Sequence, residues 1–474
     1  MGQEIGRITF SPSEFERFDA RLREETRLAE HWYREGRFER AAYVGGFELE
    51  AWLLDHNFFP LPRNAEYLAR LASALVVPEL SRFNVELNGT PQPLAGQALR
   101  RLEEELTATW RRCVEVAHEL EGQLVMIGIL PTIRQQDLTL ENISPLNRYY
   151  ALNDQILRSR AGRPIRIDIR GRERLALTHA DVMLEAATTS FQVHLQTPAE
   201  EAARCYNASL ILSAPMVALS ANAPFAFGRE VWDETRIPLF EQAVDVGDDA
   251  HPEQRRVTFG SGYLEDNPLA CYLENRDRYR VLLPIAYDEP AERLSHLRLH
   301  NGTIWRWNRM LLGFDQAWVP HLRVEHRVMP AGPSIVDMIA NAAVYLGAAR
   351  FLAGLRAPPE ADLPFAAARD NFYRAARDGL AARIRWLDGA EVDVRTLLLD
   401  ELLHMAREGL VQLGADREDG ERYLDVVATR VRTGQNGAAW QKAHAAAHGR
   451  DLFRLTADYL EHQRSAMPVH EWPV

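Results

Sequence analysis

Four short segments of the chain alternate apolar and polar residues, the pattern of strands with one apolar and one polar face. Side chains at i and i+2 share a face of a strand, so in segment 43–53 Glu48 and Glu50 point one way while Phe47 and Leu49 point the other. The same alternation recurs in segments 83–88, 191–196 and 322–328. The pattern predicts four strands, each with one apolar and one polar face.

The polar positions of these strands carry an unusual set of groups. They are carboxylates, amides, an imidazole and guanidinium groups, with no serine or threonine among them: Glu86 in the second segment, Gln192, His194 and Gln196 in the third, and Arg323, Glu325 and Arg327 in the fourth. A half-solvated outer sheet face would also show alternation. The chemistry of the side chains favours a groove lined by functional groups.

Such a groove suits one kind of chemistry. Several carboxylates beside amide or imidazole groups bind hard divalent cations such as Mg²⁺ or Mn²⁺. Arginines beside them bind phosphate or carboxylate groups through the guanidinium fork. Carboxylates, metal and arginines together indicate phosphoryl transfer, in which positioning and charge neutralisation do most of the catalysis.

The rest of the chain is mostly helical or irregular by pattern. Helices are expected at 11–36, where Ser11 and Glu14 form a capping box, and at 66–76, 97–121, 198–222 and 334–355. Residues 124–129 read as a short strand, 130–180 as loops with a hairpin near 165–169, and 228–300 as loop with short helices. From residue 357 the chain is Ala-rich and helical, a structural or oligomerisation element, so a domain boundary is expected there.

Composition excludes several classes of protein. The 474 residues carry 67 Asp and Glu against 55 Lys and Arg, a net charge of −12 that argues against a nucleic-acid partner. Lys442 is the single lysine, which excludes a lysine-containing phosphate-binding loop. The three cysteines, Cys113, Cys205 and Cys271, lack the spacing of a disulfide framework or a thiolate zinc site.

Location and partners follow from the same observations. The N-terminal residues 1–10 lack the apolar core of a signal peptide, and no uninterrupted apolar run reaches the ~18 residues of a membrane helix. We therefore expect a cytoplasmic protein that acts on small molecules, without nucleic-acid or membrane partners; a homo-oligomer stays open.

Five ordered blocks in residues 43–330 resemble the glutamate–cysteine ligase family, in the branch that joins proteobacterial and plant-type enzymes with smaller carboxylate–amine ligases. They are GFELE at 46–50, Glu79 followed by Glu86, NRY at 147–149, TSFQVHL at 189–195 with LSANAPF at 219–225, and LRVEHRV at 322–328. No block is specific alone, but their order matches the family.

The resemblance implies an α+β, glutamine-synthetase-like fold, in which a curved, mainly antiparallel sheet forms an active-site funnel and helices pack outside. Residues 1–356, with the N-terminal helix 11–36, would be the catalytic domain, and 357–474 a helical region packed on it. The implied reaction uses ATP to phosphorylate the γ-carboxylate of glutamate and then couples it to an amine, cysteine in the type enzyme. Another amine, or a non-catalytic binding protein that keeps the fold, are the alternatives.

The resemblance also implies roles for single residues. The implied metal ligands are Glu48, Glu50, Glu79, Glu86, Gln192 and Glu325. Arg327 would neutralise the transferring phosphoryl group, with Glu325 and Glu48 as its catalytic partners. Arg148 and Tyr149 would lie near ATP or glutamate, His194 near the substrate, and Arg306 or Arg309 would hold the glutamate carboxylate.

Overall fold

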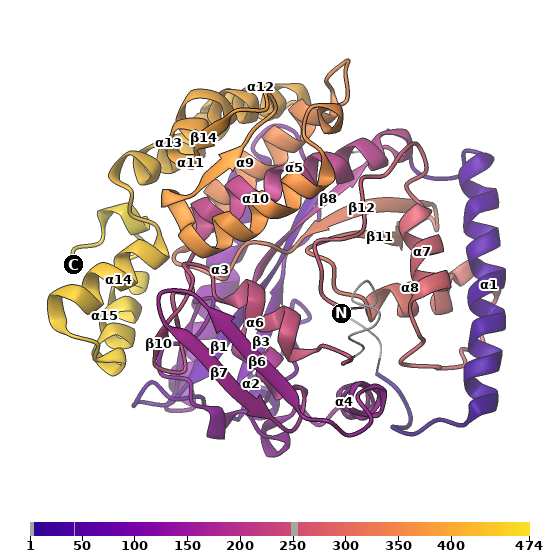
Figure 1. Cartoon of the computed structure of the whole chain (residues 1–474), viewed down its shortest axis with the longest axis horizontal. Coiled ribbons are helices and arrows are strands. Elements are labelled where there is room, and N and C mark those ends of the chain that lie inside the picture. The colour runs from indigo at the N-terminus through magenta and orange to yellow at the C-terminus, as the bar shows by residue number, and fades with distance from the viewer. Residues whose placement is uncertain (1–3, 42, 248–254) are drawn as a thin grey trace.

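A curved, mainly antiparallel sheet forms the centre of the molecule (Figure 1). The computed structural model describes residues 4–41, 43–247 and 255–474. The strands run in the order β11, β12, β8, β1, β3, β2, and β4 and β5 also pair with β1. Their bounds are β1 Val44–Leu54, β2 Val76–Pro78, β3 Asn84–Asn88, β4 Gln92–Pro93, β5 Gln123–Val125, β8 Phe191–Thr197, β11 Asn308–Phe314 and β12 Pro320–His326.

One face of this sheet is apolar and is covered by helices. The side chains of Leu49, Val193 and Val324 are at most 1 % exposed. Helix α5 (Ala202–Ser220) packs on β11 and β12, and α9 (Ile335–Ala353) packs on α5 and β8. The apolar alternation in the strands is therefore satisfied by burial against two helices that are themselves apolar on nearly every side.

The opposite face carries the polar residues and is closed by a different group of helices. Helix α8 (Ser295–Gly302) contacts β11, and α1 (Pro12–Arg34) and α7 (Ala270–Arg278) pack against α8. Figure 1 shows α1 along one edge of the molecule, beyond α7 and α8. Glu25 of α1 fixes α8 from behind, because its carboxylate lies 2.6 Å from His296 Nδ1 and accepts a 2.9 Å hydrogen bond from the Leu297 amide.

Other elements surround this core. The remaining helices are α2 Asn64–Leu71, α3 Ala98–Glu119, α4 Asn147–Ser159, α6 Arg236–Ala243, α10 Phe365–Asp378, α11 Val394–Leu397, α12 Leu403–Leu413, α13 Arg417–Thr433, α14 Gly437–His448 and α15 Leu452–Arg464. Three two-stranded sheets are formed by β6 Ile165–Arg170 with β7 Arg174–His179, β9 Phe225–Ala226 with β10 Arg229–Glu230, and β13 Arg383–Arg385 with β14 Glu391–Asp393.

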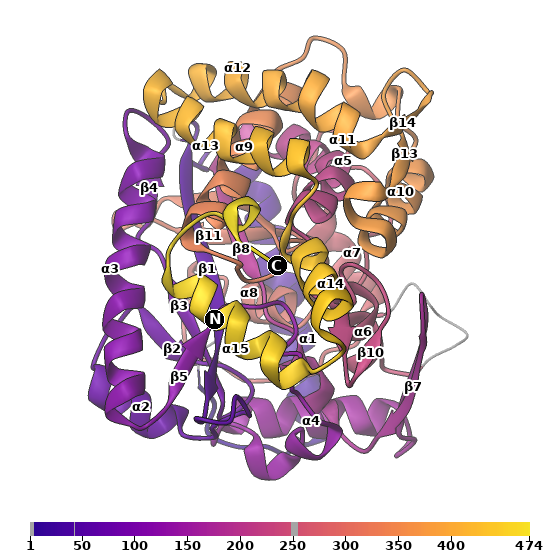
Figure 2. The same ribbon diagram turned by 90° about the vertical axis from the view of Figure 1, so that its left-hand side faces the viewer.

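The C-terminal helices lie directly on the core. Helix α12 packs along α9, and α10 packs along α5. In Figure 2, α14 and α15 face the viewer in front of the central strands. Asn222, just after α5, accepts a 2.9 Å hydrogen bond from Gln441 of α14 and donates a 2.8 Å one to Tyr459 of α15. The sole lysine, Lys442, pairs with Asp233 at 2.5 Å.

Most elements expected from the sequence are confirmed. The four alternating segments are strands of one sheet, α1 begins with the Ser11–Glu14 capping box, and α9 begins at the Ser334 cap. The three cysteines are buried and unbridged. By length and composition alone α9 could cross a membrane, but most of it is buried inside the protein as a core helix.

Two expectations were wrong, and one strand was missed. The loop predicted at 130–180 contains helix α4, which the nearby Pro, Arg and Asn residues obscured. The strand predicted at 124–129 ends at Val125, and strand β11 was missed because its alternation of Arg309 and Leu311 with buried Met310 and Leu312 does not separate polar from apolar residues. Within the predicted loop 228–300, residues 248–254 lie outside the described residues.

Candidate active site

The pairing of the strands brings the predicted polar residues together. Glu48 lies opposite Gln192 on β8, and Glu50 lies opposite Glu86 on β3. On the other side of β8, His194 lies opposite Glu325 of β12, which in turn lies opposite Arg309 of β11. Residues more than 250 positions apart in sequence thus share one face of the sheet.

The first of two carboxylate clusters contains Glu50, Glu79 and Glu86. One oxygen of each lies within 4.8 Å of the others, and all three side chains are buried. Ser190 holds Glu50 through its amide, 2.8 Å, and its hydroxyl, 3.0 Å. In the part of the chain that the structure describes, Glu79 Oε1 and Glu86 Oε2 are buried without a hydrogen-bond partner. The cluster therefore presents carboxylate oxygens that the protein itself leaves unsatisfied.

Burial dominates the electrostatics of this first cluster. Burial, with the nearby charges of Glu86 and Glu50, raises the pKa of Glu79 well above its ordinary value. Burial, with Glu48 nearby, raises the pKa of Glu86 to about 7. Burial also raises the pKa of Glu50, although Arg327 opposes the shift. Three carboxylates so close together cannot all be charged in a dry site unless a cation joins them.

The second cluster contains Glu48, His194 and Glu325. Nε2 of His194 lies 3.5 Å from Glu48 and 3.8 Å from Glu325. Arg323 donates a 3.0 Å hydrogen bond from Nε to Nδ1 of the same ring. Because Nδ1 accepts, a neutral His194 carries its proton on Nε2, directed at the two carboxylates. At 3.5 and 3.8 Å this N–H is too far for a hydrogen bond to either carboxylate, so Nε2 has no hydrogen-bond partner among the described residues and the carboxylate oxygens are the ones left to bind a cation.

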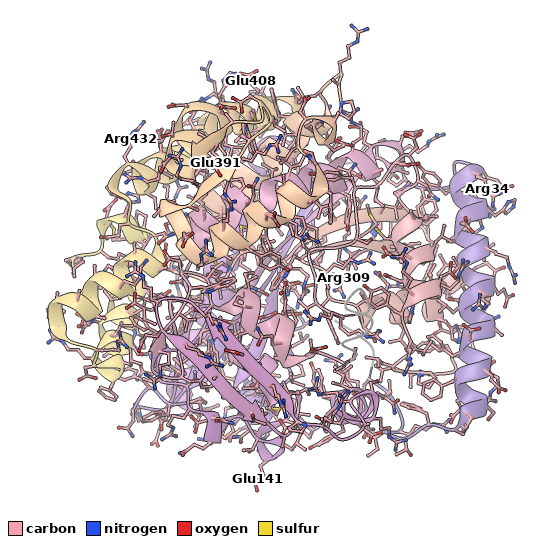
Figure 3. All side chains as sticks on the ribbon, viewed as in Figure 1. Arg34, Glu141, Arg309, Glu391, Glu408 and Arg432 are labelled. Atoms are coloured by element: carbon pink, nitrogen blue, oxygen red, sulfur yellow. The ribbon has the colours of Figure 1, made fainter. Side chains whose placement is uncertain are left out.

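Two arginines hold Glu325 in its charged form. Arg309 spans both of its oxygens, at 2.8 and 2.9 Å, and Arg327 approaches at 3.1 Å. Burial on its own would raise the pKa of Glu325, but the two guanidinium groups together hold it far below its ordinary value. Arg309 is 7 % exposed, and Figure 3 draws it within the outline of the molecule, whereas Arg34, Glu141, Glu408 and Arg432 project at the outline.

Gln192 connects the two clusters. Its amide NH₂ donates to Glu50 at 3.0 Å, and its carbonyl oxygen accepts a hydrogen bond from Arg327. Both ends of the amide are therefore engaged with site residues. This placement orients Glu50 and Arg327, and the predicted ligand role of Gln192 stays a prediction.

A cavity of about 380 Å³ opens beside the second cluster. Glu48, Glu325 and Arg309 form its floor on the sheet side, and Arg148 and Tyr149 line it at the start of α4. The Tyr149 hydroxyl accepts a 2.9 Å hydrogen bond from Arg148. Burial, with Glu79 close by, raises the pKa of Tyr149 well above its ordinary value. Arg148 and Tyr149 thus connect the cavity with the first carboxylate cluster.

Arg306 does not join this set. Its guanidinium pairs with Glu274 of α7 at 2.9 Å and lies over the Tyr279 ring at 5.7 Å, while the cavity is lined by Arg309. Of the two arginines considered for a substrate carboxylate, only Arg309 therefore borders the cavity, and there it already pairs with Glu325.

The sequence does not predict every residue of the site. Arg323 lies on the predicted polar face but has no predicted role. Burial and the nearby Glu50 raise the pKa of Glu185 to about 8, so this carboxylate adjoins the first cluster. Arg298 and Tyr272 come from helices that close the cavity from outside the sheet. Strand alternation could have indicated Arg323, whereas helix placement carries no local sequence signal.

The residues present fit a divalent cation of the magnesium type. The donors are carboxylate oxygens, the ligands that hard cations prefer, and Glu48 Oε2 adds a third buried oxygen without a partner among the described residues. Glu50, Glu79 and Glu86 would hold one ion, and Glu48 with Glu325 would face a second. Arginine groups beside them supply the positive charge that phosphate requires.

Comparison with known proteins agrees with this geometry. The family model described as glutamate–cysteine ligase family 2 matches residues 44–457. A solved structure of the glutamate–cysteine ligase of Francisella tularensis in complex with AMP is similar at 13 % identity and a TM-score of 0.57, covering 92 % of this chain and 91 % of that one. A bifunctional glutathione synthetase from Pasteurella multocida is similar at 13 % identity and a TM-score of 0.51, covering 89 % of this chain and 53 % of that one. No curated protein sequence matches.

Proposed function

Because the chain belongs to glutamate–cysteine ligase family 2, a family of ATP-dependent ligases that form amide bonds, we propose that it joins the γ-carboxylate of glutamate to the amine of cysteine. The product would be γ-glutamylcysteine, made in the cytoplasm. This reaction would be the opening step of glutathione synthesis. The observation that carries this proposal is the pair of buried carboxylate clusters beside an arginine-lined cavity.

The proposed reaction has two steps. A γ-carboxylate oxygen of glutamate attacks the γ-phosphorus of ATP, the bond from that phosphorus to the bridging oxygen breaks, and ADP leaves. The amine then attacks the acyl phosphate, inorganic phosphate leaves, and the amine loses one proton as the amide forms. Both steps move negative charge onto phosphate oxygens, so positioned positive charge lowers their barriers.

The site residues would divide the work by charge. Mg²⁺ or Mn²⁺, held by Glu50, Glu79 and Glu86 and by Glu48 with Glu325, would supply charge neutralisation for the phosphates of ATP. Arg327 would stabilise the transferring phosphoryl group, since Glu325 and Gln192 fix its guanidinium.

The groups that border the cavity would bind substrate. Arg148 and Tyr149 would contact nucleotide or glutamate. His194, which points Nε2 at Glu48 and Glu325, would orient these carboxylates next to the substrate. Arg309 rather than Arg306 would face substrate, because Arg309 lines the cavity whereas Arg306 lies outside it and pairs with Glu274.

We also propose that residues 1–356 act as the catalytic domain and that 357–474 support it. The support would come through the packing of α12 on α9 and of α10 on α5, because α9 and α5 themselves pack on the sheet.

Phosphate release tests the function. Purified protein is incubated with ATP, Mg²⁺ and glutamate, and release is followed with cysteine and with a panel of other amines. Glutamate- and cysteine-dependent release is expected. Release with other amines but not with cysteine would assign a different acceptor, and no release with any amine would leave only a binding protein that keeps the fold.

A further inference from the structure

Two arginines on the cavity wall have no carboxylate partner. Arg298 reaches the cavity from α8, and Arg323 reaches it from β12. Among the described residues, no Asp or Glu oxygen lies within 4.0 Å of either guanidinium. Arg309, which lines the same cavity, donates hydrogen bonds to both oxygens of Glu325. Arg323 uses Nε to hold His194 and keeps its two terminal nitrogens for another partner.

A buried hydroxyl faces the same space. Tyr272 of α7 lines the cavity, its side chain is 1 % exposed, and its hydroxyl has no hydrogen-bond partner in the described part of the chain. Leaving a buried hydroxyl unpaired is destabilising, and a bound acceptor would remove that cost. The cavity wall therefore carries a phenol O–H without an acceptor beside two guanidinium groups without a carboxylate partner. Arg298 is exposed and lies over the Phe314 ring at 5.8 Å, and Arg323 donates to His194 through Nε.

We propose that Arg298, Arg323 and Tyr272 form a subsite for the α-carboxylate of an amino-acid substrate. Its chemistry is distinct from that of the carboxylate clusters, which lack free positive charge and suit cation-bound phosphates. The guanidinium fork matches the two oxygens of a carboxylate, and the phenol can donate a third hydrogen bond. The proposal rests on the proposed function, in which both the donor, glutamate, and the acceptor, cysteine, carry such a group.

The test combines two changes: a substrate that lacks the α-carboxylate, and a protein variant that lacks one of the groups proposed to bind it. For the acceptor, cysteine is compared with cysteamine, and for the donor, glutamate is compared with 4-aminobutyrate, which keeps the reacting carboxylate. The variants are Arg298→Gln and Tyr272→Phe, since neither residue makes an ion pair in the described residues. Arg293→Gln, a nearby arginine that stacks on Trp318 instead of entering the cavity, is the matched control.

The proposal predicts that, in one of the two substrate comparisons, the effect of the substitution depends on whether the substrate carries the α-carboxylate. Wild-type protein should favour the substrate that has the carboxylate, and Arg298→Gln should reduce that preference in kcat/KM by about 10- to 100-fold, the effect of one charge-assisted hydrogen bond. Coupling with cysteine places the subsite at the acceptor, and coupling with glutamate places it at the donor. Arg293→Gln should leave both preferences unchanged.

Other results would overturn the proposal. Equal losses for substrates with and without the carboxylate would show that Arg298 acts only on packing, and a rise confined to the KM of ATP would assign it to nucleotide phosphate. If wild-type protein ligates no amine, the proposed function fails first. Calorimetric titration with glutamate and with cysteine then tests the subsite alone, because Arg298→Gln must weaken one of them, and no change would refute it.

Discussion

Arg309 and Glu325 face each other across β11 and β12 and join through two hydrogen bonds, 2.8 Å from Nε to Oε2 and 2.9 Å from Nη2 to Oε1. Both side chains are buried, at 8 % and 1 % exposure. The pair keeps Glu325 charged, while Glu79 and Glu86 across the sheet have raised pKa values. The site therefore combines one carboxylate that the arginines keep ionised with others whose ionised form a bound cation would stabilise.

Arg309→Gln should destabilise the protein by about 3 kcal/mol and reduce ligase activity. The variant removes one partner of a buried ion pair and leaves Glu325 with less compensation, which is the costly way to break such a pair. Urea unfolding gives the stability change. Arg374→Gln is the control, because its partner Glu391 is exposed and such a pair contributes less than about 1 kcal/mol. Equal stability of the two variants would contradict the buried pairing.

Glu48→Gln should reduce turnover by about 10²–10³-fold, the usual cost of removing one group that stabilises transition-state charge. It should leave the fold intact, because the glutamine keeps the shape and Glu48 pairs only with His194 among the described residues. Steady-state phosphate release and circular dichroism are the two measurements. Near-normal turnover would refute the assignment of Glu48 to the metal site. Glu391→Gln serves as a surface control.

The pH dependence of stability should differ between wild-type protein and Glu86→Gln. The pKa of Glu86 rises from its ordinary 4.5 to about 7, because the carboxyl is buried beside Glu48. The folded state therefore binds this proton more tightly than the unfolded state, so wild-type protein loses stability as the pH rises from about 4.5 through 7. Glutamine cannot ionise, so without divalent cations the variant should gain stability over wild type across this range.

Added Mg²⁺ should reverse that difference. A cation that binds the ionised cluster stabilises the folded wild-type protein, and more strongly at pH 7.5 than at pH 5, where protons compete. The comparison is urea unfolding of both proteins at the two pH values, with EDTA or with Mg²⁺. If the difference in stability between wild-type protein and Glu86→Gln changed with neither pH nor Mg²⁺, this would argue against a cation site at Glu86.

Much of the sheet could be predicted from the sequence, because strand alternation is a local signal. It separated the face with Glu48, Glu50 and Glu86 from the face packed on α5 and α9. Arg309 sat in a strand that alternation did not reveal, since Leu311 shares its face. Arg298 and Tyr272 reach the cavity only through the packing of α7 and α8, a long-range arrangement that no residue spacing encodes.

Arg430→Ala should destabilise the protein by about 3–5 kcal/mol, although it lies far along the chain from the sheet strands. Arg430 of α13 pairs with Asp337 of α9 at 2.6 Å, with side chains 1 % and 0 % exposed, so the substitution leaves a buried carboxylate without its charge partner. The double variant Asp337→Asn with Arg430→Met should recover much of the loss, because it removes both charges. A single cooperative urea transition in all three proteins would indicate that α9 and α13 unfold as one unit. If Arg430→Ala unfolded in two steps, with the earlier step in the C-terminal helices, residues 357–474 would be a separable domain instead of a support for the catalytic sheet.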